Sequence, residues 1–255
     1  MIDLHCHILP GLDDGAVDEV ASLEMLQVAV DEGITVIAGT PHHRNGQFMN
    51  ECEVILASVE RLNVLAKKNN LNIKIVPGME IRLSGEIEED HQNQKIMPLG
   101  GDTRYILVEF SNRHIPHFTE RLFANLQGLG LHPIIVHPER NSELQSNPNK
   151  LIQMIEKGAL VQVTASSLTG HFGRDAQKFA YQLMDADAVH LIASDAHNVT
   201  SRGFHMKTAF DVINKKYGSN YVYELQTNAE NILKNKLVYP PQPSPIKRKK
   251  ILGIF

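Results

Sequence analysis

The chain has 255 residues, of which 42% are hydrophobic, and this is enough for one barrel-sized core. Its formal charge of −4, with no gathering of basic residues on any one predicted helix, disfavours nucleic acid as a partner. Two cysteines are too few for a disulfide framework, no apolar run approaches a membrane span, and the chain opens on a predicted strand rather than a signal peptide. We therefore expect a cytoplasmic protein.

Seven apolar, β-branched segments predict β-strands. In chain order they cover residues 2–8, 34–40, 73–78, 105–110, 133–138, 159–165 and 190–196. Helical periodicity lies between them, as in Val20, Leu23, Leu26 and Val30, with Gly33 placed as a helix stop. Alternating strands and helices predict parallel strands, in an open doubly wound sheet or a closed barrel. No strand end carries a G-x-G-x-x-G or G-x-x-x-x-G-K-[ST] fingerprint, which excludes the usual nucleotide-binding forms of the open sheet.

Histidines and carboxylates recur along the first strand and at the ends of the others. His5 and His7 share one face of the first strand, because strand side chains alternate. At or just after later strands stand His42, Glu80, Glu109, His137, Asp195 and His197. The carboxyl ends of parallel strands meet on one face of a barrel, where catalytic groups collect. Any one of these residues alone would be an ordinary core or loop residue, but six strands with the same feature predict a shared site.

The chemistry of these residues indicates a metal centre. An unpaired carboxylate near a core carries a desolvation cost of several kcal/mol, which a cation would offset. Imidazoles and carboxylates without a cysteine favour Mn, Fe or Zn over a closed structural zinc site. The ligands are too many for one ion, and Glu80 is suited to bridge two ions roughly 3.5 to 4 Å apart, as in phosphoester hydrolases. Arg140 and Arg202 stand beside these ligands, either as bidentate phosphate holders or as ordinary salt bridges.

The motifs HCHILPGLDDG, TPHH, GMEIR, VEF, HPERN and SDAHNVTSRGFH, in this order, resemble the PHP (polymerase and histidinol phosphatase) superfamily. More narrowly, they resemble the manganese-dependent protein-tyrosine phosphatases of Gram-positive capsular and exopolysaccharide loci. The resemblance covers the chain from Met1 to about Asn235 and is weakest over residues 84–102 and the C-terminal tail. It implies an α/β fold, a distorted seven-stranded (β/α)7 barrel, with a three-metal site that holds Mn²⁺, or Fe or Zn as alternatives.

The resemblance also assigns ligands to each metal. It places one metal on His5, His7, Glu80 and Asp195, a second on Glu80, Glu109 and His137, and a third on Asp14, His42 and His197. Asp14 enters on the resemblance alone, since the loop GLDDG is otherwise an ordinary turn. Arg140 and Arg202 are implied as catalytic, phosphate-binding residues.

The function that the resemblance implies is a metal-dependent protein-tyrosine phosphatase. Its expected substrate is the phosphorylated, tyrosine-rich tail of a bacterial kinase that controls polysaccharide synthesis. The alternatives are a histidinol-phosphatase-like small-molecule phosphomonoesterase and a regulator without turnover. Cysteine catalysis is disfavoured because the residues six positions beyond Cys6 and Cys52 are Leu12 and Ser58, so neither cysteine begins a C-x5-R loop. His43 is a weak candidate for a general acid, with a structural role as the alternative.

The C-terminus differs in composition from the rest of the chain. We divide the sequence into a phosphatase domain over residues 1–238 and a tail over 239–255, which is rich in proline and contains four consecutive basic residues before an apolar end. Such a tail is either solvated or docks onto an anionic membrane surface or a membrane-bound partner. The second case would recruit the protein to the inner face of the membrane.

Overall fold

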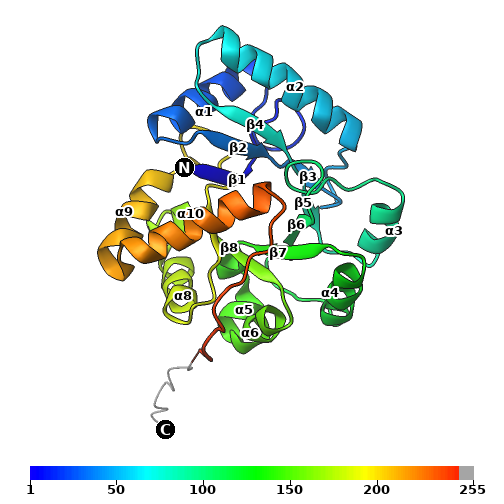
Figure 1. The fold of residues 1–255 in the computed structure, drawn as a ribbon, viewed down its shortest axis with the longest axis vertical. Helices are drawn as coiled ribbons and strands as arrows, with labels where there is room; N and C mark the ends of the chain where they lie inside the picture. Colours follow the sequence, from blue (N-terminus) through cyan, green and yellow to red (C-terminus); the bar gives the residue numbers. More distant parts are fainter. Residues whose placement is uncertain (247–255) are drawn as a thin grey trace.

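The strands form two parallel sheets in the computed structural model, which describes residues 1–246 (Figure 1). The three-stranded sheet has the order β1, β2, β4, with bounds Ile2–Cys6, Val36–Gly39 and Lys74–Pro77. The six-stranded sheet has the order β3, β5, β6, β7, β8, β9, with bounds His42–His43, Glu80–Arg82, Tyr105–Glu109, His132–Val136, Leu160–Thr164 and Leu191–Ala193. The prediction of an α/β fold with parallel strands is confirmed.

Two of the predicted strands are interrupted. The strand expected over residues 34–40 is β2, which ends at Gly39. The next strand, β3, begins after Pro41, which has no N–H to donate to a neighbouring strand. The strand expected over 73–78 likewise ends as β4 and resumes as β5. At this second break a Cβ on Gly78 would lie 2.9 Å from the Thr40 side chain. The segments around Gly78 and Thr40 can therefore approach closely because glycine has no Cβ.

The ring of strands is joined at β1 and β9 by an isolated bridge rather than by a full ladder. The bridge pairs Cys6 with Ala196, and His7 N donates to the Ala196 carbonyl at 2.9 Å. Asp195, just beyond β9, has a left-handed φ of +52°, which takes the chain out of strand geometry at this point. The two sheets are therefore not closed into a continuous seven-stranded barrel, which is where the structure departs from the expectation.

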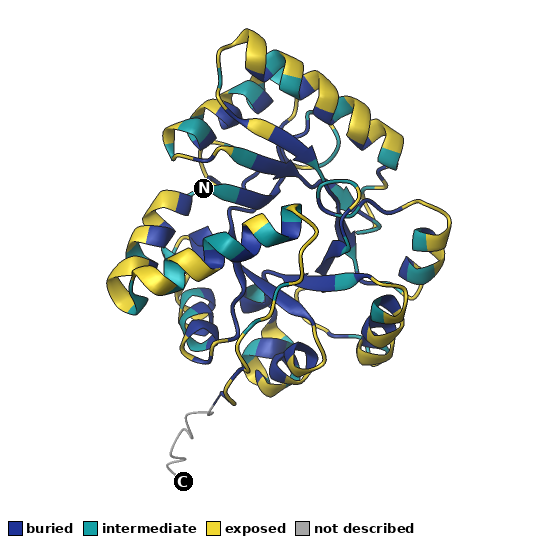
Figure 2. Cartoon of the chain, viewed as in Figure 1, coloured by how far each residue is buried: buried dark blue, intermediate teal, exposed yellow. Residues whose placement is uncertain are grey.

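Helices cover the outer faces of the sheets and leave a dark, buried centre (Figure 2). They are α1 Glu19–Asp31, α2 Cys52–Lys68, α3 Ile87–Gln92, α4 Thr119–Gly128, α5 Ser142–Ser146, α6 Asn149–Glu156, α7 Ala165–Leu168, α8 Arg174–Asp185, α9 Met206–Tyr217 and α10 Ser219–Leu233, with a 3-10 turn at Pro138–Arg140. A smaller core cluster includes Leu107 and Ile134 from the strands and Ile232 from α10, so α10 packs against the strands' inner apolar residues.

In the first helix, α1, the apolar periodicity predicted the burial of some residues correctly and of others wrongly. Gly33 follows α1 with a φ of +86°, as expected of a helix stop. Leu26 is buried as predicted, but Val20 is 65% exposed. The helix begins at Glu19 with the Asp18 side chain capping the N–H of Ala21, which leaves Val20 in the first turn on the solvent side.

The proline-rich segment after α10 lies against the body of the protein as far as residue 246. Ser244 N donates to the Ala186 carbonyl at 2.8 Å, and Ile246 N donates to Asn149 Oδ1 at 3.1 Å. Ile246 is buried. This part of the predicted tail is therefore not freely solvated, while the basic run at 247–250 lies outside the described residues.

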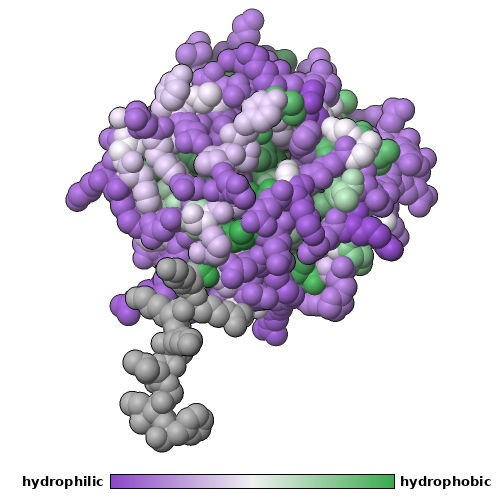
Figure 3. Space-filling model, turned by 60° about the horizontal axis from the view of Figure 1, so that its bottom comes forward, coloured by the Kyte–Doolittle hydropathy of each residue, from purple (hydrophilic) through white to green (hydrophobic). Residues whose placement is uncertain are grey.

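The surface is mostly hydrophilic in the view of Figure 3, with hydrophobic residues scattered between the polar ones. Within residues 1–246, none of the helices combines the length and the apolar character that a membrane span requires.

Candidate metal centre

His5 on β1 and His7, just after its end, face the same side, as alternation predicts. Their Nε2 atoms are 3.3 Å apart, and both side chains are completely buried. Asp195 Oδ1 lies 3.6 Å from His5 Nε2 and 3.3 Å from His7 Nε2. Glu80 Oε2 lies 3.4 Å from His5 Nε2 and 3.3 Å from His7 Nε2. Two imidazoles and two carboxylates thus converge on one point at the carboxyl ends of the strands.

Glu80, at the start of β5, is the central residue of the cluster. Its Oε2 lies 2.7 Å from His42 Nδ1, and its Oε1 lies 2.7 Å from His137 Nε2. Burial raises the pKa of Glu80, but the charge of His5 and hydrogen bonds from the surrounding histidines outweigh burial and hold this pKa well below its usual value. Glu80 is therefore ionised and reaches histidines from several strands.

Glu109, the last residue of β6, is the neighbouring carboxylate. Its Oε2 lies 3.9 Å from His42 Nδ1 and 2.9 Å from Arg82 Nη2. Burial, and then the charge of Glu80, raise the pKa of Glu109 to about 7. Glu80 and Glu109 have donor atoms within 4.8 Å of each other, so the two buried carboxylates repel, and a shared cation would relieve this repulsion.

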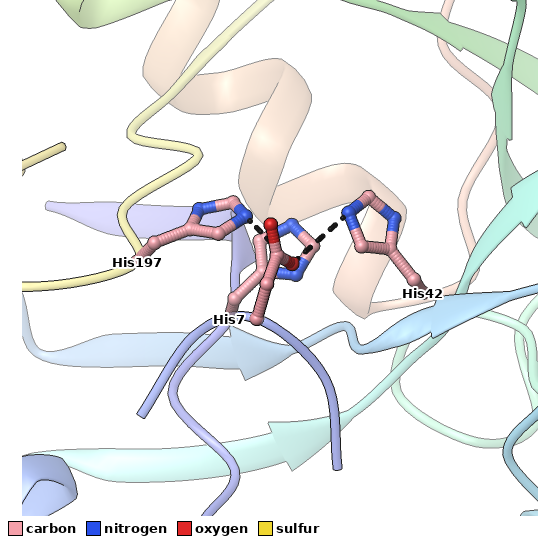
Figure 4. A group of neighbouring side chains, drawn as sticks. His7, His42 and His197 are labelled. Atoms are coloured by element: carbon pink, nitrogen blue, oxygen red, sulfur yellow. Dashed lines mark ion pairs between the residues drawn. The ribbon is translucent and has the colours of Figure 1, made fainter. Parts of the chain in front are cut away.

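Asp14 reaches the cluster from the loop after β1. Its Oδ1 lies 3.4 Å from His42 Nε2 and 3.4 Å from His197 Nε2. The rings of His7 and His197 are stacked with centroids 3.8 Å apart. Figure 4 shows His42 and His197 on either side of one carboxylate, with His7 between them. The geometry therefore brings Asp14, rather than Asp13, to this pair of histidines.

All nine predicted ligands come together. Three groups have donor atoms mutually within 4.8 Å, and they are His5, His7 and Glu80; His42, Glu80 and Glu109; and His7, Asp14, His42 and His197. Asp195 and His137 adjoin these groups through the contacts given above. The groups share more residues than the three ligand sets that the resemblance implies. His7 also belongs to the group with Asp14, and His42 also belongs to the group with Glu80 and Glu109.

Several buried donor atoms in the cluster have ion-pair contacts but no well-aligned hydrogen bond among the described residues. They are His42 Nδ1 and Glu80 Oε2, which face each other, Glu109 Oε2, which faces Arg82, and His197 Nε2, which faces Asp14. Buried polar atoms without well-aligned hydrogen bonds are costly and rare in folded proteins. Nitrogen and oxygen donors of this kind suit divalent Mn, Fe or Zn, so the residues present fit a metal centre.

Two further residues orient the histidines, and the sequence analysis missed both. Asp13 Oδ2 lies 2.6 Å from His7 Nδ1 and accepts from the backbone N–H of His42 at 3.0 Å. Gln162 Oε1, on β8, lies 2.9 Å from His5 Nδ1. Contacts of this type fix the ring and leave Nε2 for a metal. The available signal was a glutamine inside the buried run ALVQVTA and the first acid of the pair in GLDDG.

The two predicted arginines stand at the edge of the cluster. Arg140 Nη2 donates to Asp195 Oδ2 at 2.5 Å, and its guanidinium lies over the Phe172 ring at 4.8 Å. Arg202 lies 3.4 Å from Asp14 Oδ2 and 3.5 Å from Asp195 Oδ2. Both arginines line a hollow of about 320 Å³, together with His42, Glu109, Asn112, His137 and Asp195. The hollow thus combines candidate ligands with two cationic groups.

His43 and the cysteines take no part in this hollow. His43 is buried, with Nδ1 2.8 Å from the Asn50 carbonyl, and it lines a separate hollow that also includes Cys52. This favours the structural role for His43. Cys6 is fully buried, burial raises the pKa of its thiol, and Sγ lies 3.4 Å from the Ala196 carbonyl. A thiolate at Cys6 is therefore disfavoured.

Comparisons with known proteins agree with this site. A family model described as capsular polysaccharide synthesis, CpsB/CapC, matches residues 1–234. Tyrosine-protein phosphatase YwqE of Bacillus subtilis is 44% identical over 255 residues, and the putative tyrosine-protein phosphatase CapC of Staphylococcus aureus is 36% identical over 259 residues; both alignments cover 100% of each chain.

A crystal structure from work on YwqE of Bacillus subtilis and CpsB of Streptococcus pneumoniae, described as unique metal-dependent tyrosine phosphatases, has a TM-score of 0.95 at 44% identity. It covers 97% of this chain and 100% of its own. An organophosphorus hydrolase from Deinococcus radiodurans has a TM-score of 0.56 at 13% identity over 91% of each chain, a likeness of fold alone.

Proposed function

The chain belongs to the CpsB/CapC family of capsular polysaccharide synthesis, and from that premise we propose that it is a metal-dependent protein-tyrosine phosphatase with a manganese centre. The observation that carries the proposal is the convergence of nine histidine and carboxylate side chains, some with buried atoms that lack well-aligned hydrogen bonds, beside two arginines in one hollow. The proposed activity is that of relatives named tyrosine-protein phosphatases, and the alignments cover the full length of those relatives.

The metal ligands we propose are the nine residues of the cluster. Glu80 would be the carboxylate shared between ions, because its two oxygens face His42 on β3 and His137 just after β7. We propose three ions and Mn²⁺ as the metal, with Fe or Zn as alternatives that the same donors would accept. Bound ions of this kind neutralise phosphoryl oxygens and activate water for attack on phosphorus.

The chain's own part in the reaction is to hold the phosphate and leave room for an aryl ester. Arg140 and Arg202 carry planar guanidinium groups suited to bidentate contact with phosphoryl oxygens. Each is already paired with a carboxylate of the cluster, which fixes its direction before substrate arrives. Tyrosine phenolate, with a pKa of about 10, is a fair leaving group that requires no strong general acid.

The proposal also covers the barrel architecture, the protein substrate and the cellular location. We propose that the seven strand positions act as one distorted barrel, divided at residue 238 from the tail. The substrate we propose is the phosphorylated tail of a bacterial tyrosine kinase that controls capsular or exopolysaccharide synthesis, in the cytoplasm. The basic run at 247–250 would add peripheral contact with an anionic membrane. The description of the matching family supports a role in capsule synthesis.

The test is phosphate release by metal-stripped protein that is resupplied with Mn²⁺, Fe²⁺ or Zn²⁺. A phosphotyrosine peptide, a phosphoserine peptide and histidinol phosphate are the substrates, and the Cys6→Ser variant is the control against cysteine catalysis. We expect chelator-sensitive turnover, strongest on phosphotyrosine, that Cys6→Ser retains. Preference for histidinol phosphate would replace the proposal with the small-molecule phosphatase. Metal binding without any turnover would favour the regulator.

A further inference from the structure

Asn112 is the one residue without a titratable side chain in the lining of the hollow that holds the two arginines. It follows β6 in the loop that leads to α4, three residues after Glu109. The other lining residues are acids, histidines or the two arginines. Asn112 belongs to none of the sequence motifs quoted above, and the metal cluster does not include it.

The backbone around Asn112 is fixed to the segment that carries Arg140. Ser142 N donates to the Asn112 carbonyl at 3.0 Å, and Asn141 Nδ2 donates to the Ser111 carbonyl at 2.7 Å. Both partners come directly after Arg140 in the chain. Asn112 and Arg140 therefore keep a constant relation to each other, as two groups that act on one substrate must.

The side chain of Asn112, in contrast, is free. It is exposed and has no hydrogen-bond partner in the part of the chain that the structure describes. Other loop asparagines use their side chains locally, as Asn50 does with the His42 carbonyl and Asn141 with the Leu144 N–H. A loop with an anchored backbone and an unused amide at a reaction site points to a ligand contact.

We infer that the Asn112 side-chain amide donates a hydrogen bond to the ester oxygen of the bound aryl phosphate; this rests on the proposed function. The side chains of Arg140 and Arg202 are 20% and 31% exposed, so they and the buried metal ligands of the lining, Glu109, His137 and Asp195, are less exposed than Asn112. A phosphate held by these less exposed groups directs its ester oxygen and ring outward, toward the amide.

The amide acts where charge develops. In hydrolysis, phosphorus forms a bond to a water oxygen and its bond to the phenolic oxygen breaks, with the electron pair left on that oxygen. The water gives up a proton to solvent, and the phenolate takes one from solvent after it departs. A neutral N–H donor stabilises the growing negative charge on the phenolic oxygen without any transfer of its own proton. Its effect therefore grows with the basicity of the leaving group.

The experiment is a leaving-group series on the Mn²⁺-loaded enzyme. The wild type, Asn112→Ala and Arg113→Ala are assayed with a phosphotyrosine peptide, phenyl phosphate and p-nitrophenyl phosphate, whose leaving group is the weakest base of the three. Arg113, the next residue of the same loop, is exposed and serves as the matched control on the small substrates. Metal content and melting temperature are measured on each protein.

We expect Asn112→Ala to lose about 10- to 100-fold in kcat/KM on phosphotyrosine and phenyl phosphate, but less than about threefold on p-nitrophenyl phosphate. Arg113→Ala should stay within about twofold on the two small substrates, because its side chain is outside the hollow. An equal loss on all three substrates, or no loss, would overturn the inference while wild-type turnover upholds the proposed function. A wild type without turnover would overturn both.

Discussion

Removal of the Asp13 side chain should weaken metal binding although, in this structure, Asp13 belongs to none of the donor groups. One Asp13 oxygen contacts His7 Nδ1 at 2.6 Å and the His42 N–H at 3.0 Å, and the other accepts from the Gly15 N–H at 2.9 Å. Asp13→Ala frees the His7 ring to turn and leaves two backbone donors unpaired. Two candidate ligands thus lose their support at once.

The magnitude follows from the type of contact. Groups that orient a metal-bound histidine contribute about 10- to 100-fold in affinity, which corresponds to about 1 to 3 kcal/mol in binding free energy. The unpaired His42 and Gly15 N–H groups would each lower the free energy of unfolding by about 1 to 3 kcal/mol where water does not replace the lost hydrogen bond. Metal affinity and folding stability should therefore both fall, with the ligand set intact.

The assay is calorimetric titration of Mn²⁺ into metal-free protein, with urea unfolding of the same samples. Asp102→Ala is the control, because Asp102 is an exposed aspartate in the loop before the amino end of β6, whereas the donor groups lie at the carboxyl ends of the strands. We expect unchanged stoichiometry and weaker binding for Asp13→Ala, and wild-type behaviour for the control. Wild-type Mn²⁺ affinity in a folded Asp13→Ala protein would show that Asp13 does not support metal binding through His7 and His42.

Three further predictions concern other parts of the site and core. Arg140→Lys should lower kcat/KM on phosphotyrosine by about 100-fold, because an ammonium cannot make the bidentate contact; steady-state kinetics at saturating Mn²⁺ would contradict this if the loss were under threefold. Gly15→Ala should lower the free energy of unfolding by about 2 kcal/mol or more, since the new Cβ would lie 2.0 Å from the His7 carbonyl oxygen, and an unchanged melting temperature would be incompatible with the structure. Burial lowers the pKa of His190 to about 4, and its Nδ1 accepts from the Val161 N–H. The unfolded chain therefore binds more protons between about pH 6.5 and 4, so His190 reduces stability as pH falls through that range, by up to about 3 kcal/mol. In His190→Asn, urea unfolding at pH 7 and pH 5 should show a smaller difference than in wild type, and an equal difference would count against this role.

Much of the fold follows from local pattern. Each of the seven apolar runs overlaps a strand of the structure, because alternation and β-branched residues express burial on a pleated sheet, but β3 and β5 lie outside the runs. The break after Gly39 is followed by Pro41, whereas the break after Pro77 involves the close approach of Gly78 to Thr40, which local pattern does not encode. Local pattern also misplaced Val20, because the start of α1 depends on the Asp18 cap.

The candidate site divides in the same way. Residue type and position at strand ends were sufficient to select His5, His7 and Glu80, because parallel topology brings the carboxyl ends of strands together. Their role as metal ligands stays a prediction for the metal titration. The contacts of Asp13 and Gln162 with histidine rings depend on side-chain directions that no spacing along the chain encodes.

Local sequence pattern predicts which residue types reach the carboxyl ends of the strands, because strand alternation and chain direction are local properties of the backbone. Which atoms of those residues meet depends on the tertiary structure. Glu80 contacts four histidines, Asp14 stands between His42 and His197, and Asn112 is held beside Arg140, all through contacts between residues distant in the chain. Such contacts depend on how strands and loops pack, and packing is a property of the whole fold.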